Sequence, residues 1–423
     1  MLRITFLLIL TMGSIRLQAQ QADVLPDGTE GELLEKVEGD SVPEKWRHKR
    51  WRLFTGRYST IKLGGGFLYE YAGYLQDENS RRQMDSLGTP LSGEFKVRDF
   101  RIVASGQLKT KRSISWKAGF MFDGATRTWL IRETGVMIGV PELWGHLFVG
   151  RTKEGFSLNK VMNGYAGWTM ERQMAIDVIP ILADGIKWLG FLPKQKILWN
   201  VGIYADWLSK NQSFSTYRWQ WAARVGILPM YNEARKEVFH VAFNYRYGQP
   251  EDKTIRVRSR PEANPAPFFV DAGTMNADYS NHYGIEAYYR KGPWLFGTEM
   301  YTHSFHAAGG GNPVFAGGDL VATFILTGET RPYNTTTGIF GFVPVSKPLF
   351  KGGLGAWELV FRYSNLDLND VKGGRFWRFT PMVNWYMTKD LRLELAYGYG
   401  VLDRFELRGA TQFFQARLQF TLL

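Results

Sequence analysis

The sequence predicts an all-β protein, a transmembrane antiparallel β-barrel of about 16 strands. Two observations favour this class. Segments of roughly ten residues in which every second side chain is apolar recur along most of the chain, as expected for strands with one face on lipid and the other on a polar lumen. The 423 residues also include 46 Gly and 15% aromatic residues beside a charged share of 22%, which is typical of barrels whose apolar signal is diluted at every second position.

The composition excludes several other classes. The chain has no Cys, so disulfide scaffolds, zinc ribbons, thiol nucleophiles and a lipoprotein anchor are ruled out. A hydrophobic fraction of 44% is too high for a disordered chain. Beyond residue 20, no uncharged apolar run approaches the roughly 20 residues that a membrane helix needs. A helical membrane protein is therefore excluded.

The first element is a cleavable secretory signal at residues 1–19. Arg3 precedes an apolar run over residues 4–12, and Ala19 supplies the small residue before the cut, which is the layout of an export signal. Residues 20–61 are polar and mixed in charge, and we expect them to form a periplasmic N-terminal segment. The formal net charge is +12, but export argues against nucleic acid as the partner of this basic protein.

The barrel domain is predicted over residues 62–423, where the period-2 pattern begins. In one clear strand, Trp219 and Trp221 alternate with Arg218 and Gln220. A soluble β-sandwich or propeller would show the same alternation with its apolar face inward. Long strands with Trp and Tyr at their ends, and no propeller-like repeat, favour the membrane barrel instead.

Connection lengths set the number of strands. With the N-terminus in the periplasm, short turns should follow strands of even order. The sequence offers seventeen candidate strands, and an odd number breaks this alternation of short and long connections. If residues 254–260 belong instead to a long connection over residues 248–280, the alternation is restored and about 16 strands remain. The stretch over residues 328–353 then faces the periplasm despite its length. Tight turns are predicted at residues 109–112, 141–145, 192–196, 291–293 and 388–390.

The lumen decides the function, because a barrel of about 16 strands encloses an aqueous channel rather than a filled core. Arg is expected where phosphate or carboxylate is recognised, since its planar fork donates two parallel hydrogen bonds. An Arg that faces a Glu across a lumen is equally a structural ion pair. The polar strand faces carry slightly more basic than acidic residues, and the basic ones are Lys117, Lys187, Arg218, Arg224, Arg246, Arg290, Arg362, Arg378, Arg392 and Arg417.

Two further basic groups are stronger candidates for an anion path. Three Arg at every second residue would lie on one side of an extended segment and form a short ladder, or else a solvated loop. The long segment over residues 152–184 is the natural candidate for a loop folded into the barrel, where a constriction strips water from a solute and makes each charge count more. The ladder consists of Arg256, Arg258 and Arg260, and the loop contains Lys153, Lys160 and Arg172.

Several motifs are similar to one known family. They read Val-Arg-Asp-Phe-Arg at residues 97–101, Val-Gly-Arg-Thr-Lys-Glu-Gly-Phe-Ser at 149–157, Thr-Met-Glu-Arg at 169–172, Arg-Ser-Arg-Pro-Glu at 258–262 and Gly-Ala-Trp-Glu-Leu at 355–359. In these stretches the chain resembles the phosphate-selective porin O and P family of outer-membrane proteins. The resemblance implies a 16-stranded homotrimer whose third extracellular loop narrows the pore and whose Arg and Lys side chains carry anions.

The resemblance also implies individual site residues. Lys153 matches the family's Lys-Glu-x-Phe stretch at the start of the constriction loop, and Arg151 lies in the same motif. Arg98 and Arg101 match the basic second strand, although Asp99 dilutes this pair. Together with the near balance of charge in the lumen, Asp99 favours an anion-preferring diffusion channel over a strictly phosphate-specific one.

No enzyme, metal or cofactor is predicted. The chain lacks Gly-x-Ser-x-Gly and the Lys-Ser/Thr of a phosphate-binding loop. His303 and His306 have metal-ligand spacing, but no third ligand lies nearby in the sequence.

The sequence therefore predicts an outer-membrane porin of a Gram-negative bacterium. It would be a passive channel for inorganic anions such as phosphate or polyphosphate, in contact with outer-membrane lipid and lipopolysaccharide. The alternatives are a general non-selective porin, and an outer-membrane barrel that acts as an adhesin or a hydrolase.

Overall fold

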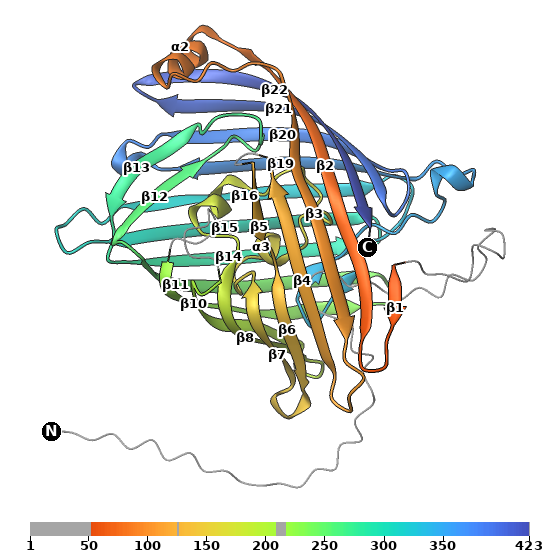
Figure 1. Ribbon diagram of the computed structural model, residues 1–423. Coiled ribbons are helices and arrows are strands. Elements are labelled where there is room, and N and C mark those ends of the chain that lie inside the picture. The colour runs from red at the N-terminus through yellow and green to blue at the C-terminus, as the bar shows by residue number, and fades with distance from the viewer. Residues whose placement is uncertain (1–51, 125–126, 209–216, 423) are drawn as a thin grey trace, which may run out of the picture.

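The computed structural model describes residues 52–124, 127–208 and 217–422, so the signal predicted at residues 1–19 and most of the segment over residues 20–61 lie outside the described residues. Within the described part, one antiparallel sheet closes on itself as a barrel (Figure 1). Consecutive strands pair along the chain, and the last strand closes the ring on the first. The prediction of a 16-stranded barrel is confirmed.

Most strands of the barrel are continuous, and one is interrupted. β5 (Thr128–Ile131) pairs with the end of β4 and β6 with its beginning, so these two form one barrel strand that is broken at Arg132 and Glu133. β1 (Leu53–Thr55) adds to the start of β2. The other strands are β2 (Thr60–Gln76), β3 (Glu94–Gln107), β4 (Ile114–Asp123), β6 (Thr134–Val140), β7 (Gly145–Thr152), β8 (Ala183–Leu192), β9 (Ile197–Ala205), β10 (Tyr217–Asn232), β11 (Glu237–Pro250), β14 (Tyr279–Lys291), β15 (Trp294–His306), β16 (Val314–Ile325), β19 (Ala356–Asp367), β20 (Arg375–Tyr386), β21 (Leu391–Arg404) and β22 (Leu407–Leu422).

The strands expose apolar side chains outward and bury polar side chains inward. On β21, Leu395 and Tyr397 are exposed, whereas Arg392 and Glu394 on the opposite face are buried. An apolar outer face suits lipid, and a polar inner face suits a lumen. This alternation is the physical origin of the period-2 pattern in the sequence.

The two ends of the barrel differ in their connections. All five predicted tight turns join successive strands at one end, which is the periplasmic end in barrels of this kind. Most of the longer loops lie at the opposite end, although residues 405–406 alone join β21 to β22 there. One of these longer loops contains β12 (Thr254–Ser259) and β13 (Val270–Asn276), which pair with each other in a separate sheet. We call this pair the outer hairpin, and it confirms that residues 254–260 are not a barrel strand.

Several connections contain short helices. In α2 (Glu78–Ser86), Asp77 caps the N-terminus by accepting a hydrogen bond from the Ser80 backbone N–H at 2.7 Å. The side chain of Gln83 donates to three carbonyls at the junction of β21 and β22, so α2 covers the loop end of these strands (Figure 1). Among the described residues, no helix is long and apolar enough to cross a membrane. The other helical turns are α3 (Leu158–Val161), η1 (Pro141–Leu143), η2 (Met174–Val178), η3 (Leu349–Lys351) and η4 (Asn369–Val371).

The connection between β16 and β19 is long although it lies at the turn end. It carries β17 (Tyr333–Asn334) and β18 (Ile339–Phe340). Tyr333, Ile339 and Phe340 are buried in one apolar cluster with Trp168 and with inward side chains of the barrel strands. This connection, which we call the insert (residues 326–355), is therefore long because it fills part of the lumen.

Candidate anion path in the barrel lumen

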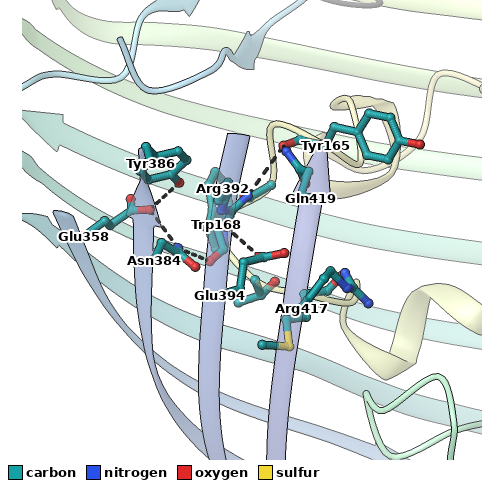
Figure 2. A network of polar contacts seen from close by, with 12 residues as sticks. Tyr165, Trp168, Glu358, Asn384, Tyr386, Arg392, Glu394, Arg417 and Gln419 are labelled. Atoms are coloured by element: carbon teal, nitrogen blue, oxygen red, sulfur yellow. Dashed lines mark hydrogen bonds and ion pairs between the residues drawn. The ribbon is translucent and has the colours of Figure 1, made fainter. Parts of the chain in front are cut away.

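Residues 153–182, between β7 and β8, lie inside the barrel and are called the lumen loop. Residues 151–163 are all buried. Side chains on the wall formed by β20, β21 and β22 donate to successive backbone carbonyls of the loop, as Figure 2 shows. The donors are Asn384 to Trp168 at 2.9 Å, Arg392 to Gly167 at 2.8 Å and Gln419 to Tyr165 at 3.0 Å.

The start of the lumen loop is held by a different wall. Its backbone N–H groups donate to acceptors on β11, β14 and β15, at 2.9 Å for Ser157, 2.6 Å for Leu158 and 2.8 Å for Asn159. The acceptors are Asn244, Glu286 and Glu299. The loop is therefore fixed on two sides of the barrel, and many charged lumen side chains serve as its supports.

The structure places Lys153 and Lys160 among these supports. Lys153 Nζ lies 3.2 Å from Glu133 and donates to the carbonyl of Met162 at 3.0 Å. Lys160 Nζ lies 2.6 Å from Glu154, which also accepts from Arg246 at 2.9 Å. Burial lowers the pKa of Lys160 to about 8. Neither ammonium group faces open solvent.

Arg151 and Arg224 are also fully buried and paired. Arg151 lies 3.3 Å from Asp184. Arg224 lies 2.5 Å from Glu286 and donates to the carbonyl of Gly338 at 2.8 Å, which attaches the insert to the barrel wall. Arg151 therefore joins neighbouring strands of the barrel wall, whereas Arg224 joins the wall to the insert.

Arg218 and Arg256 lie away from this interior. A bulge between Tyr217 and Trp219 shifts the register of β10, and Arg218 is exposed at the bulge rather than buried beside Gln220. Arg256 is exposed on the outer hairpin and is paired with Asp271 at 2.6 Å. Strict alternation placed Arg218 in the lumen, and the bulge is the physical reason for the difference.

The remaining predicted cations gather on one side of the lumen. Arg98 donates two hydrogen bonds to Glu171 of the lumen loop, at 2.9 and 3.2 Å. Arg101 lies 2.7 Å from Asp99. The side chains of Arg98 and Arg101 stay 26% and 16% exposed, so water reaches them, unlike the fully buried supports.

Arg172 of the lumen loop approaches Arg101. A Cβ atom at Gly164 would lie 3.6 Å from Arg172 Nη1 and 3.9 Å from Arg101 Nη2, so two guanidinium groups meet beside this glycine. Burial and the positive charge of Arg101 lower the pKa of Arg172 to about 10. An anion placed between these groups would relieve their mutual repulsion.

The outer hairpin adds two further guanidinium groups. Arg258 and Arg260 both stack on Phe268, with their central carbons 4.0 and 4.3 Å from the ring centre. Burial lowers the pKa of Arg260, and so does the nearby charge of Arg98, although Asp177 opposes this shift. The hairpin thus brings its Arg residues close to the basic side chains of β3.

Sequence reasoning missed two members of this group. Arg132 sits at the break between β5 and β6 and interacts electrostatically with Arg101 and Arg172. Two consecutive charged residues, Arg132 and Glu133, within an otherwise apolar strand were the available signal. Lys96, two residues before Arg98, interacts with Arg260 in the same way. The basic cluster therefore consists of Lys96, Arg98, Arg101, Arg132, Arg172 and Arg260.

Among the described residues, no group of three or more His, Asp or Glu could hold a metal ion. His303 is instead buried against His282, with their Nδ1 atoms 2.8 Å apart. His306, the other half of the predicted pair, stacks on Tyr279 at a distance of 4.6 Å between ring centres.

A closed 16-stranded barrel with a loop folded into a charged lumen defines an outer-membrane porin, a channel and not an enzyme. The chain belongs to the phosphate-selective porin O and P family, whose model matches residues 69–422. The protein is therefore located in the outer membrane of a Gram-negative bacterium.

Individual relatives are more distant. Porin O of Pseudomonas aeruginosa is 24% identical over 199 residues, which cover 40% of this chain and 44% of the relative. The chain spans less than half of the length of the curated relatives that it matches. The fold is similar to that of OmpT of Vibrio cholerae, with a TM-score of 0.52, 10% identity and coverage of 87% of this chain and 99% of that one. An anion-selective porin from Comamonas acidovorans gives a TM-score of 0.50 at 10% identity, with coverage of 86% and 99%.

Proposed function

We propose that this porin is a passive diffusion channel that prefers anions, with phosphate and polyphosphate among its solutes. The observation that carries the proposal is the basic cluster, because its six cations converge from β3, the break in the fourth barrel strand, the lumen loop and the outer hairpin. Guanidinium forks match the geometry of oxyanions. The family description and the anion-selective porin of similar fold support the same class of solute.

The order of the cations along the lumen suggests how an anion would travel. Arg258 and Arg260, which both stack on Phe268, would receive it at the loop end. Lys96 and Arg98 would follow on β3. Arg101, Arg132 and Arg172 would bind it next, beside the lumen loop, where partial exclusion of water strengthens each charge.

The carboxylates of the cluster favour a preference for anions in general over strict phosphate selectivity. Asp99 and Glu171 each accept hydrogen bonds from cluster members, so part of the positive charge is already neutralised. Lys153, Lys160, Arg151 and Arg224 act in this proposal by positioning the lumen loop and the insert, not by binding solute.

We further propose a homotrimer surrounded by outer-membrane lipid and lipopolysaccharide. The resemblance of the motifs to the family carries this part of the proposal, and the exposed apolar outer face of the barrel suits contacts with lipid or a second copy. The mass of the detergent-solubilised protein, measured by light scattering, distinguishes one copy from three.

Anion preference is tested by the reversal potential of the channel in a planar bilayer under a KCl gradient. We expect the reversal potential to lie closer to the equilibrium potential of chloride than to that of potassium. We also expect added phosphate to reduce the chloride current. Arg98→Ala and Arg260→Ala should each weaken the preference severalfold, because each removes a water-accessible charge from the path. Arg112→Ala is the matched control, since Arg112 is 47% exposed at a turn and is paired with Glu142.

Three other outcomes would each reject this proposal in a different way. Conductance without anion preference would identify a general porin that shares only the fold. No conductance from a folded, heat-modifiable barrel would favour an adhesin. An equal effect of Arg112→Ala would show that overall charge, and not the basic cluster, sets the preference.

A further inference from the structure

Tyr165 lies where the lumen loop meets the β2–β3 wall. A Cβ atom at Gly66 of β2 would lie 2.1 Å from a ring carbon of Tyr165, so the ring fits only because residue 66 has no side chain. The Tyr165 hydroxyl donates to Asp99 at 2.5 Å. The guanidinium of Arg101 stacks on the ring, 4.2 Å from its centre. Together these contacts place the phenol across the gap between the loop and the wall.

Exposure changes on either side of this ring. Tyr165 is 4% exposed and Asp99 1%. Toward the loop end, Arg98 is 26% exposed. Toward the turn end, the side chains of Lys117 and Glu133 are 16% and 13% exposed. The buried ring therefore lies between two groups of charged side chains that keep some exposure.

Strand register shows that these regions lie one above the other along the barrel. Gly66 pairs with Arg101 of β3, at the level of the Tyr165 ring. Lys117 pairs with Ser105, which lies nearer the turn end of β3. A solute that moves from Arg98 toward Lys117 along this wall must pass the level of Tyr165.

The backbone of Tyr165 is fixed to the barrel wall, and its ring is the part that could move. Its backbone carbonyl is held by Gln419, whereas the phenol is kept in place by one hydrogen bond, one stacked guanidinium and the notch above Gly66. Rotation about the Cα–Cβ bond would withdraw the ring while the loop backbone stays fixed.

We propose that Tyr165 is the gate of this pore, and that an anion bound by Arg98 and Arg101 reaches Lys117 only when the phenol leaves the notch above Gly66. The inference rests on the proposed channel function. An oxyanion that binds the Arg101 guanidinium competes with both Asp99 and the aromatic ring for it. The permeating anion thus itself favours the open position of the gate.

Three variants test the gate by single-channel conductance in planar bilayers. Tyr165→Ala removes the ring, and Gly66→Ala forces the ring out of its notch without changing any charge. Both should raise the conductance by roughly threefold or more, because the width of a constriction limits the current. Tyr165→Phe keeps the ring but removes its hydrogen bond to Asp99, so its conductance should lie between those of the natural protein and Tyr165→Ala. Heat-modifiable migration in gel electrophoresis confirms that each variant is folded.

The conductance and the reversal potential separate this inference from the proposed function. A folded Tyr165→Ala variant with unchanged conductance overturns the gate, whatever the ion preference. A rise in conductance in a channel without anion preference keeps the gate and rejects the proposed selectivity. If all folded variants stay silent, the ring does not control the passage and the inference fails. A silent natural protein beside a conducting Tyr165→Ala variant supports it.

Discussion

Replacement of Arg331 by Ala is expected to lower the free energy of unfolding by about 3–5 kcal/mol, the usual cost of removing one partner from a buried ion pair. Arg331 belongs to the insert and is 2% exposed. Its guanidinium lies 2.8 Å from Glu358 of β19 and donates to the hydroxyl of Tyr386 at 2.8 Å. It also donates to the carbonyl of Ala166 in the lumen loop at 2.8 Å. One side chain thus joins the insert, the lumen loop and the barrel wall.

The measurement is urea unfolding of the refolded barrel in lipid vesicles, with Arg375→Ala as the matched control. Arg375 is paired with Asp367, but its side chain is 57% exposed, and an exposed pair contributes only about 0–1 kcal/mol. Arg331→Lys should recover only part of the loss, since an ammonium group cannot make the forked contact. Equal losses for Arg331→Ala and Arg375→Ala would show that Arg331 is not a central support.

Replacement of Glu133 by Gln is expected to raise the preference for anions by roughly an order of magnitude. Glu133 lies 3.2 Å from Lys153 and 3.6 Å from Lys117, and it follows Arg132 at the break in the fourth barrel strand. Its side chain is only 13% exposed, so solvent screens this charge less than it screens a charge at the surface. Gln keeps the shape of the side chain and removes the negative charge from the middle of the path.

The reversal potential under a KCl gradient measures this effect. Glu142→Gln provides the control, because Glu142 is 61% exposed and is paired with Arg112 at a turn. The Glu133→Gln reversal potential should move toward that of an ideal chloride channel, whereas the control should not move. A shift toward cations, or no shift in a folded variant, would place the anion path elsewhere in the lumen.

The sequence contained most of the information about the barrel. Apolar and polar side chains alternate in β10 and β21 because one face of each strand contacts lipid and the other faces the lumen. This pattern can be read from the residues of one strand alone. The parity of short turns then excluded residues 254–260 from the barrel, and the structure pairs that segment only within the outer hairpin. Motifs such as the one over residues 149–157 indicated the family without any knowledge of contacts.

The candidate site was only partly predictable. Arg98, Arg101, Arg172 and Arg260 belong to the basic cluster, as the ladder, the loop and the family motifs suggested. The supporting role of Lys160 was hidden, because its partner Glu154 precedes it in an irregular loop that gives no periodic signal. Arg132 was missed since a break in a strand defeats the alternation on which the assignment of faces depends.

The class of protein was thus readable from the residues alone, because the same two-residue alternation holds wherever a strand separates lipid from a lumen. The roles of the individual cations became clear only in the folded barrel. Some form buried ion pairs that support the lumen loop and the insert, and others stay accessible to water. That choice depends on partners far apart in the chain, such as Arg331 with Glu358 and the Ala166 carbonyl. The lumen loop and the insert fold against walls built from distant strands, and no local pattern records where their carbonyls will meet a guanidinium.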